Sequence, residues 1–335
     1  MFIVQNYHLA VLLCVVTMLC WGSWGNTQKL ASKSWRYELF YWDYVIGILL
    51  LSLLLGLTMG SCGSEGRSFL ADLRQIEWTT ALNAMIGGIV FNAANILLSA
   101  AVALAGMSVA FPVGVGLALV IGVCINYLAM PKGDPTLLFA GVALVVVAII
   151  LNGVAAGKMP RSGENGKSGK TGLVLAVISG ILMSMFYRFV AAAMDLEHFE
   201  QPEAGLATPY TAFFLFAAGI LISNLLFNTL AMKHPFAGPA LSYKDYFQGR
   251  FQTHLVGVLG GVVWGVGTLF SYIAAGKAGA AISYALGQGA PMIAALWGIL
   301  VWHEFRGGPK SNTARLTLMI LFFLAGLGLI VYAGI

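Results

Sequence analysis

The sequence predicts an all-α integral membrane protein of ten transmembrane helices, arranged as two inverted five-helix repeats. Three observations lead to this prediction: the composition, a series of long apolar segments, and an internal repeat. Of the 335 residues, 59% are hydrophobic and only 9% are charged, whereas a soluble domain typically has about 25% charged residues. The mean hydropathy of +0.86 also favours a chain whose helices are largely surrounded by lipid.

Apolar segments long enough to cross a bilayer recur along the whole chain. The predicted spans are 8–28, 38–59, 79–104, 107–130, 136–156, 172–194, 209–231, 255–275, 279–302 and 315–334. A membrane β-barrel would instead show short segments of alternating hydrophobicity. The first span has neither a basic leading segment nor a small-residue cleavage pattern before Trp21, so we interpret it as a retained helix.

The stretch 87–116 returns at 260–289, shifted by 173 positions without a gap. The repeated glycines are Gly87, Gly88, Gly106, Gly114 and Gly116, which correspond to Gly260, Gly261, Gly279, Gly287 and Gly289. A shorter repeat relates 47–49 to 219–221. Because each half holds an odd number of spans, the second half must be inverted relative to the first. Inverted halves are typical of secondary transporters.

The repeat divides the chain into a first unit at 1–156, a linker at 157–171 and a second unit at 172–335. The linker is rich in Gly, Ser and Lys, and we predict it to be flexible and cytoplasmic. Its end resembles a phosphate-binding loop, but Glu164 stands where that motif requires glycine, so a solvated basic linker is the better interpretation. Aromatic residues in the loop at 233–254 predict a short helix at the membrane interface.

Lysine and arginine are unevenly distributed between the two predicted sides. The connections after the first, fifth, seventh and ninth spans hold Lys29, Lys33, Arg36, Lys158, Arg161, Lys167, Lys170, Lys233, Lys244, Arg250, Arg306, Lys310 and Arg315. The other side holds Arg67, Arg74, Lys132 and Lys277. The positive-inside rule puts the richer side in the cytoplasm, so we predict a plasma-membrane protein with both termini outside. The net charge of +5 then reflects attraction to anionic lipids, with no nucleic acid as partner.

No residue pattern in the chain indicates catalysis or metal binding. Cys14, Cys20 and Cys124 lie in apolar spans and Cys62 lies in a loop, without zinc, haem or disulfide-framework spacing. The acids and histidines are scattered over loops and helix ends. We therefore expect no enzyme activity and no cofactor. The coupling ion would be a proton, with sodium as the alternative, and the sequence leaves both a monomer and a homodimer open.

Ionisable side chains inside spans are costly and are therefore the first functional candidates. Asp43, about one turn into the second span, could carry a coupling proton, or it could be an acid favoured by the dipole at a helix start. Arg188, near the outer end of the sixth span, could hold a carbonyl-rich substrate, reach the surface, or pair with Asp195. Glu304 is a candidate gate or anchor residue with Arg306 as its partner.

A flat heterocyclic substrate needs an aromatic face and hydrogen-bonding groups at its edge. Gln288, between two repeated glycines at mid-span, is the strongest single candidate, and Tyr284 lies one turn earlier on the same side. The other candidates are Trp21 and Trp24 in the first span, Asn92 and Asn95 in the third, and Trp264 and Tyr272 in the eighth. Tryptophans near helix ends also mark membrane interfaces, and buried amides can bind a neighbouring helix instead of a ligand.

Several short motifs resemble the ureide permease family of the drug/metabolite transporter superfamily. They are Tyr41-Trp42-Asp43-Tyr44, Gly87-Gly88-Ile89-Val90, Ala105-Gly106-Met107-Ser108-Val109, Ile121-Gly122, Asn126-Tyr127-Leu128, Trp297-Gly298-Ile299-Leu300 and Glu304-Phe305-Arg306. The resemblance covers nearly the whole chain. It implies the ten-helix drug/metabolite transporter fold and proton-coupled uptake of small polar heterocycles such as allantoin and uracil. The plant members carry a long central loop, which is short here. Bacterial rhamnose and glucose porters look similar too.

The sequence thus favours a proton-coupled secondary transporter that imports a nucleobase or ureide by alternating access. A monosaccharide symporter is the alternative within the same fold. A multidrug exporter and a membrane receptor that does not transport are alternatives of other classes. Sugar sites need more hydrogen-bonding side chains than heterocycle sites, and the supply of tryptophans and amides leans slightly towards the heterocycle.

Overall fold

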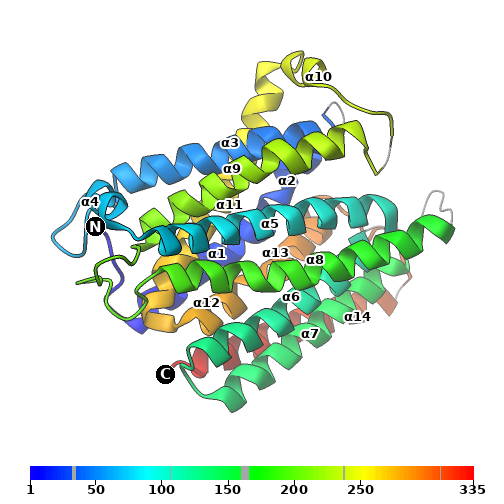
Figure 1. The fold of residues 1–335 in the computed structure, drawn as a ribbon. Helices are drawn as coiled ribbons and strands as arrows, with labels where there is room; N and C mark the ends of the chain where they lie inside the picture. Colours follow the sequence, from blue (N-terminus) through cyan, green and yellow to red (C-terminus); the bar gives the residue numbers. More distant parts are fainter. Residues whose placement is uncertain (32–34, 106, 160–165, 237, 310) are drawn as a thin grey trace.

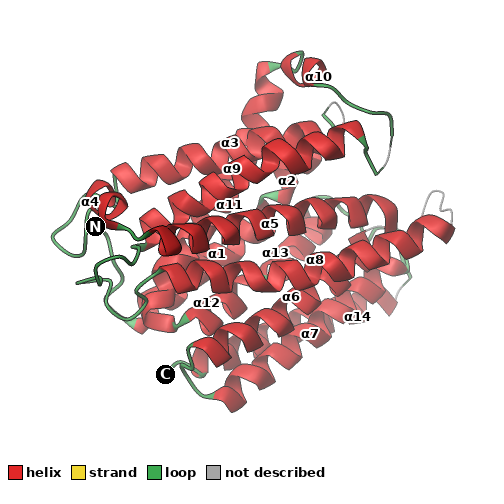
Figure 2. Ribbon diagram, viewed as in Figure 1, coloured by secondary structure: helices red, strands yellow, loops and turns green. Residues whose placement is uncertain are grey.

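The computed structural model of the protein describes residues 1–31, 35–105, 107–159, 166–236, 238–309 and 311–335. These residues form a bundle of helices, and Figure 2 shows no strand among them. The helices are α1 (Tyr7–Ser23), α2 (Gly25–Ala31), α3 (Tyr37–Leu57), α4 (Phe69–Gln75), α5 (Trp78–Ala105), α6 (Met107–Ala129), α7 (Pro135–Gly157), α8 (Gly166–Ala193), α9 (Pro209–Lys233), α10 (Tyr243–Phe247), α11 (Phe251–Ala278), α12 (Ala280–Gly287), α13 (Ala290–Leu300) and α14 (Ser311–Tyr332).

Within the described residues, nine helices are long and apolar enough to cross a membrane. They correspond to nine of the ten predicted spans, and local signals explain where several begin. The Asn6 side chain accepts a hydrogen bond from the Leu9 amide at the start of α1, and Asp134 caps α7 in the same way before Pro135. The helix α8 begins at Gly166, so the final residues of the predicted linker are helical. Residues 160–165 lie outside the described residues.

The predicted span at 279–302 is not one continuous helix. It is divided into α12 and α13 at Gln288 and Gly289, where the amides of Gly289 and Met292 bond to carbonyls three residues back instead of four. Pro291 has no N–H to offer the Gly287 carbonyl, which removes one helical bond at this point. The single ninth span predicted from hydropathy is therefore two helices, divided beside Pro291. Interrupted helices at membrane depth occur where the freed backbone is buried in protein or lines a cavity.

The helices α5 and α11 lie at the centre of the bundle, between the helices of both halves (Figure 1). Their bounds are related by the same shift of 173 residues that relates the sequence repeats. Glycines bring each of them into backbone contact with a neighbour. A β-carbon on Gly88 of α5 would lie 2.1 Å from the Phe216 carbonyl oxygen of α9, and one on Gly261 of α11 would lie 2.0 Å from the Tyr44 carbonyl oxygen of α3. Only glycine permits such close helix packing.

A second glycine pair follows the same rule. A β-carbon on Gly47 of α3 would lie 2.3 Å from the Val258 carbonyl oxygen, and one on Gly219 of α9 would lie 2.2 Å from the Met85 carbonyl oxygen. The connection after the eighth predicted span is a single residue. Gly279 joins α11 to α12 with φ of +83°, a conformation that favours glycine. Its repeat partner Gly106 lies outside the described residues.

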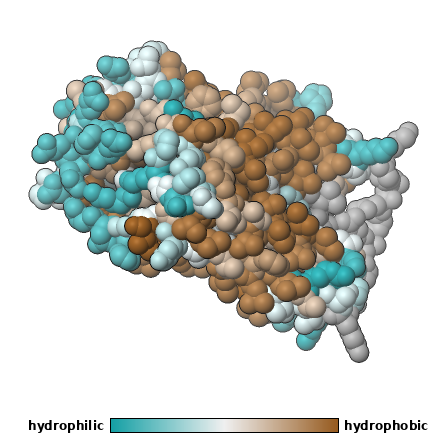
Figure 3. Space-filling view, turned by 90° about the horizontal axis from the view of Figure 1, so that it is seen from below, coloured by the Kyte–Doolittle hydropathy of each residue, from teal (hydrophilic) through white to brown (hydrophobic). Residues whose placement is uncertain are grey.

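On the face shown in Figure 3, a broad apolar region adjoins one polar end, and a few hydrophilic residues border it on the opposite side. Both termini and α4 lie at one end of the bundle, and the start of α8 lies at the other (Figure 1). The short helix predicted in the loop at 233–254 is present as α10. It exposes Phe247 and Tyr243, while Tyr246 turns inwards against Trp35 and His254. Exposed aromatic rings beside charged residues suit a helix that lies at a lipid surface.

Candidate functional site

A cavity of about 120 Å³ lies at the interruption between α12 and α13. It brings together five of the predicted substrate-binding residues. These are Trp21, Trp24, Asn95, Trp264 and Gln288. Helices of both halves of the chain therefore contribute to one cavity. The side chains around it within the described lining include no ionisable group.

Aromatic rings form much of the cavity wall. Trp264 of α11 packs at 4.5 Å between ring centroids from Phe91 of α5, and it stacks on Trp21 of α1 at 6.2 Å and 12°. The Trp21 indole donates a hydrogen bond of 3.0 Å to the Thr268 hydroxyl, which fixes the orientation of the ring. Trp24 packs against Tyr44 of α3 at 4.9 Å. Such flat, rigid faces can bind a planar ring by stacking.

Two amide side chains supply hydrogen-bonding groups beside these rings. The Asn95 amide nitrogen donates to the Tyr41 hydroxyl at 3.1 Å. Gln288 stands at the helix interruption, is 8% exposed, and interacts with the Tyr284 hydroxyl. Because an amide is both donor and acceptor, the pair can recognise both kinds of group on a ligand edge.

Tyr284 and Tyr272 do not line this cavity. Tyr284 is fully buried, and its hydroxyl donates to the Ala118 carbonyl at 3.1 Å and reaches the Met183 carbonyl at 3.4 Å. Its ring also lies against Gly122, where a β-carbon would be only 2.5 Å from it. Ala118 and Met183 line the cavity, so Tyr284 closes it from behind. Tyr272 is fully buried among other aromatic rings.

Asn92 points away from the cavity, towards α9. Its amide nitrogen donates to the Ser223 hydroxyl at 2.9 Å and to the Ile220 carbonyl at 3.4 Å. Of the two amides predicted in the third span, only Asn95 faces the cavity. Asn92 therefore joins α5 to α9, which is the packing role that the sequence left open as the alternative to ligand binding.

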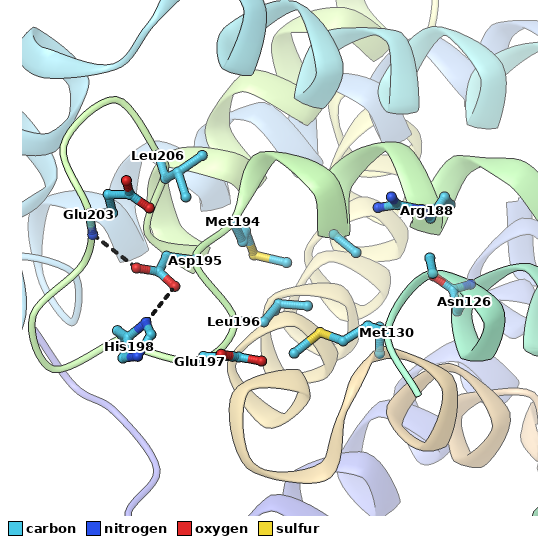
Figure 4. A pocket seen from close by; sticks show the side chains of 13 residues that line it. Asn126, Met130, Arg188, Met194, Asp195, Leu196, Glu197, His198, Glu203 and Leu206 are labelled. Carbon is cyan, nitrogen blue, oxygen red and sulfur yellow. Dashed lines mark hydrogen bonds and ion pairs between the residues drawn. The ribbon is translucent and has the colours of Figure 1, made fainter. Parts of the chain in front are cut away.

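Arg188 lies in a different, larger cavity of about 330 Å³ at one end of the bundle (Figure 4). This end carries the acidic loop between α8 and α9, which holds Asp195, Glu197, Glu200 and Glu203. The predicted alternative pairing with Asp195 does not form. The Asp195 carboxylate instead lies 3.2 Å from His198 Nδ1 and accepts a 2.9 Å hydrogen bond from the Glu203 amide. Arg188 and Gln288, both predicted to bind substrate, therefore line different cavities.

Asp43 lies outside both cavities, at the start of α3. It is 2% exposed and accepts hydrogen bonds from the Tyr246 hydroxyl at 2.6 Å and the Trp35 indole at 3.2 Å. His254 Nδ1 of α11 lies 2.8 Å from the same carboxylate. Burial, and then the adjacent Asp43 carboxylate, raise the pKa of Tyr246, so its hydroxyl remains a donor. The sequence did not indicate Tyr246 and His254 as partners, because they lie 203 and 211 residues further along the chain, whereas Trp35 comes from the segment just before α3.

Glu304 pairs with Lys29, and not with Arg306 as predicted. The Lys29 ammonium also lies 4.5 Å from the centre of the Trp302 ring. Both charged side chains of the pair are substantially exposed. The ion pair joins the end of the first span to the segment after α13, at the helix end away from the acidic loop.

Sequence reasoning missed several residues of the cavity wall. Phe91 and Phe186 add two aromatic rings, and Ser179 and Met183 also line the cavity. Apolar residues in membrane helices give no individual signal, since most of them face lipid or other helices. The one available signal was Pro291, whose position inside a predicted span indicated an interruption.

Comparisons with known proteins identify the family of the chain. The family model described as ureide permease matches residues 40–160 and 160–333. Ureide permease 1 of Arabidopsis thaliana is 25% identical over 98% of this chain and 98% of its own, and Ureide permease 2 of the same plant is 24% identical with the same coverage. A Lactococcus lactis protein whose name assigns it to sugar uptake is 23% identical over 94% of this chain and 95% of its own.

One crystal structure covers 97% of this chain and 96% of its own with a TM-score of 0.62, at 16% identity, which indicates a shared fold. The plant relatives are named as permeases, which are transporters and not enzymes. These relatives and the long apolar helices together indicate a multi-pass membrane protein.

Proposed function

This chain belongs to the ureide permease family, and from that premise we propose that it imports a small, neutral, polar solute of the ureide or nucleobase class. The observation that supports this most is the cavity at the helix interruption, with aromatic walls, two amides and no ionisable group in its described lining. A charged substrate would lose its hydration there without an opposite charge to replace it. A neutral ring with amide groups on its edge can stack on the tryptophans and hydrogen-bond to Asn95 and Gln288.

The size of the cavity also favours a small substrate. Pockets for drug-sized ligands usually measure roughly 300–1,000 Å³, whereas this one measures about 120 Å³. A single-ring solute therefore fits the site better than the bulky ligands of a multidrug exporter.

We propose that transport proceeds by alternating access in a ten-helix fold of two inverted repeats. The paired glycines support this architecture, because Gly88 and Gly261 make the same backbone contact in opposite halves. The cavity lies between those halves, at an interrupted helix, as is typical of transporters built from repeats. Tyr284 closes the cavity on the side of the acidic loop, so access from that side requires Tyr284 to move. In this proposal both termini face outwards at the plasma membrane.

Asp43 is the proposed proton carrier. It is buried, and His254, which is partly exposed, links it towards solvent. The next residue, Tyr44, packs directly on Trp24 of the cavity wall. Protonation of Asp43 would alter the contacts that hold α3 to α10 and α11, and Tyr44 would transmit that change to the substrate site. Sodium is the alternative coupling ion.

Uptake into proteoliposomes tests the proposed function. Labelled uracil and allantoin should accumulate in vesicles with an imposed proton gradient, and a gradient of sodium alone should not drive accumulation. The two variants Gln288→Ala and Trp24→Ala should lower the uptake of the transported compound. Absence of uptake of both compounds by the wild-type protein would refute the proposed substrate class.

A monosaccharide is the second candidate substrate. It is supported by the Lactococcus lactis relative, which matches most of both chains. Tryptophan faces bind sugar rings as well as heterocycles, but a sugar also needs several hydrogen-bonding side chains around its hydroxyls. Uptake of labelled glucose or rhamnose in the same vesicles, with no uptake of uracil or allantoin, would favour this candidate.

A further inference from the structure

The larger cavity, near the acidic loop, is lined by two polar groups, one donor and one acceptor, that have no hydrogen-bond partner among the described residues. Arg188 of α8 makes no hydrogen bond or ion pair within the described residues. Asn126 of α6 is 1% exposed, and its amide oxygen is buried without a hydrogen-bond partner. Both residues line the same cavity, and Figure 4 places them together at one end of it.

The hydrogen bond made by the amide nitrogen of Asn126 fixes which way its amide group is turned. Its nitrogen donates to the Gly122 carbonyl at 2.8 Å, and an oxygen in that place would repel the carbonyl. The unpaired atom is therefore the acceptor. An acceptor left buried without a partner destabilises a protein, so such a group is a reason to look for a missing ligand.

Together the two side chains present one donor and one acceptor. The Arg188 guanidinium can donate to a carbonyl oxygen, and Asn126 Oδ1 can accept from an N–H group. The –CO–NH– edge of an amide, ureide or nucleobase carries a carbonyl oxygen next to an N–H. One such edge could bind both groups, because it offers an acceptor to Arg188 and a donor to Asn126, which neither a hydrocarbon nor a simple anion does.

The charges around the cavity restrict the ligand further. Its other end carries Asp195, Glu197 and Glu203, while His198 lies beside Asp195 (Figure 4). An anionic ligand drawn to Arg188 would be repelled by these carboxylates. A neutral ligand would not be, so the surroundings select a neutral amide over a carboxylate.

We propose that this cavity is a second substrate site, an outer vestibule in which Arg188 and Asn126 bind the neutral amide edge of the solute before it reaches the central cavity. We call the part of this cavity around Arg188 and Asn126 the vestibule. One turn of α6 links the vestibule to the central cavity. Asn126 bonds to Gly122, and Gly122 packs on the Tyr284 ring that closes the central cavity. The inference rests on the proposed function for the identity of the solute.

Equilibrium binding to the purified full-length protein in nanodiscs provides the test. The probe is hydantoin, a neutral ring with –CO–NH– edges, and its matched anion is N-carbamoylglycine, the ring-opened acid. Arg188→Gln and Asn126→Leu should each weaken hydantoin binding at the vestibule by about 5- to 150-fold, the equivalent of one lost buried hydrogen bond. The control is Arg74→Gln, which changes an exposed arginine in the last turn of the short helix α4 on the same side.

Three features of the result separate this inference from simpler explanations. Asn126→Leu should retain or raise the thermal stability of the free protein while weakening binding, because it removes an unsatisfied acceptor, whereas a purely structural Asn126 would lower stability. In a two-site binding isotherm, Arg188→Gln should weaken only the vestibule phase and Gln288→Ala only the central phase, because the two sites are separate. In proteoliposomes of known orientation, Arg188→Gln should raise the half-saturating concentration only on its own side of the membrane.

If both Arg188→Gln and Asn126→Leu bind hydantoin as tightly as the wild type, and the wild type still transports the solute, the vestibule proposal is refuted and the proposed function stands. If the protein binds N-carbamoylglycine more tightly than hydantoin, the ligand of the vestibule is not a neutral amide. The same conclusion follows if glucose binding depends on Arg188 and Asn126 as strongly as hydantoin binding does. Absence of any hydantoin or uracil binding by the wild type would overturn the vestibule together with the proposed function. If Gln288→Ala is the only variant that loses hydantoin binding, the central site is supported and the vestibule is refuted.

Discussion

Replacing Gly261 with alanine tests the helix packing that positions the central cavity. A β-carbon there would lie 2.0 Å from the Tyr44 carbonyl oxygen and 2.9 Å from the Ile48 amide nitrogen. Both atoms belong to the backbone and cannot rotate away, so α11 and α3 must separate by about 1 Å. Overpacking of this kind costs about 1–3 kcal/mol, and we expect the upper part of that range. Trp264, one turn along α11, would shift with the helix.

The equivalent change in the other half is Gly88→Ala, whose β-carbon would lie 2.1 Å from the Phe216 carbonyl oxygen. Because the contact has the same geometry, its cost should be similar. Gly116→Ala is the matched control, since a β-carbon there meets no atom within 4 Å. Alanine is a better helix former than glycine by about 1 kcal/mol, so the control should be neutral or slightly stabilising.

Thermal unfolding of the three variants in detergent, followed by tryptophan fluorescence, measures these differences. Uptake in proteoliposomes at a temperature where all variants remain folded shows whether the shift of Trp264 reaches the substrate site. Equal stability of Gly261→Ala and Gly116→Ala would refute the packing of α11 on α3. A large loss in Gly261→Ala with none in Gly88→Ala would refute the equivalence of the two halves.

Three further outcomes are expected. An impermeant thiol reagent applied to intact cells should label the exposed Cys62 of the wild type, whereas Ser168→Cys should remain unlabelled in a cysteine-free background; the reverse pattern would invert the predicted topology. Asp43→Asn should abolish uphill uptake but retain substrate exchange, because exchange needs binding and reorientation without net proton movement; normal uphill uptake would remove Asp43 as the proton carrier. Gln288→Ala and Trp24→Ala should each weaken substrate binding by about 5- to 150-fold, and wild-type affinity in both would exclude them from the site.

The limits of sequence reasoning are clearest at the ninth predicted span. Its hydropathy gave the correct extent, but the interruption at Gln288 depends on how Gly289 and Pro291 are accommodated between neighbouring helices. A proline in a membrane helix is compatible with either a kink or a complete break. The same holds for Arg188, whose place in the chain fitted either the central site or the outer end of the helix.

The sequence by itself determined the membrane class and the extent of the long helices, and its repeated glycines marked close helix contacts. These features depend on the hydropathy and the small residues of each helix taken alone. It also indicated five residues of the central cavity, because tryptophans and amides inside apolar spans are conspicuous. Only the tertiary structure decided which of the polar side chains meet. Asn92 and Asn95 lie one turn apart on α5, yet one bonds to α9 and the other lines the cavity. The rotation of each helix against its neighbours, set by contacts between residues distant in the sequence, makes that choice.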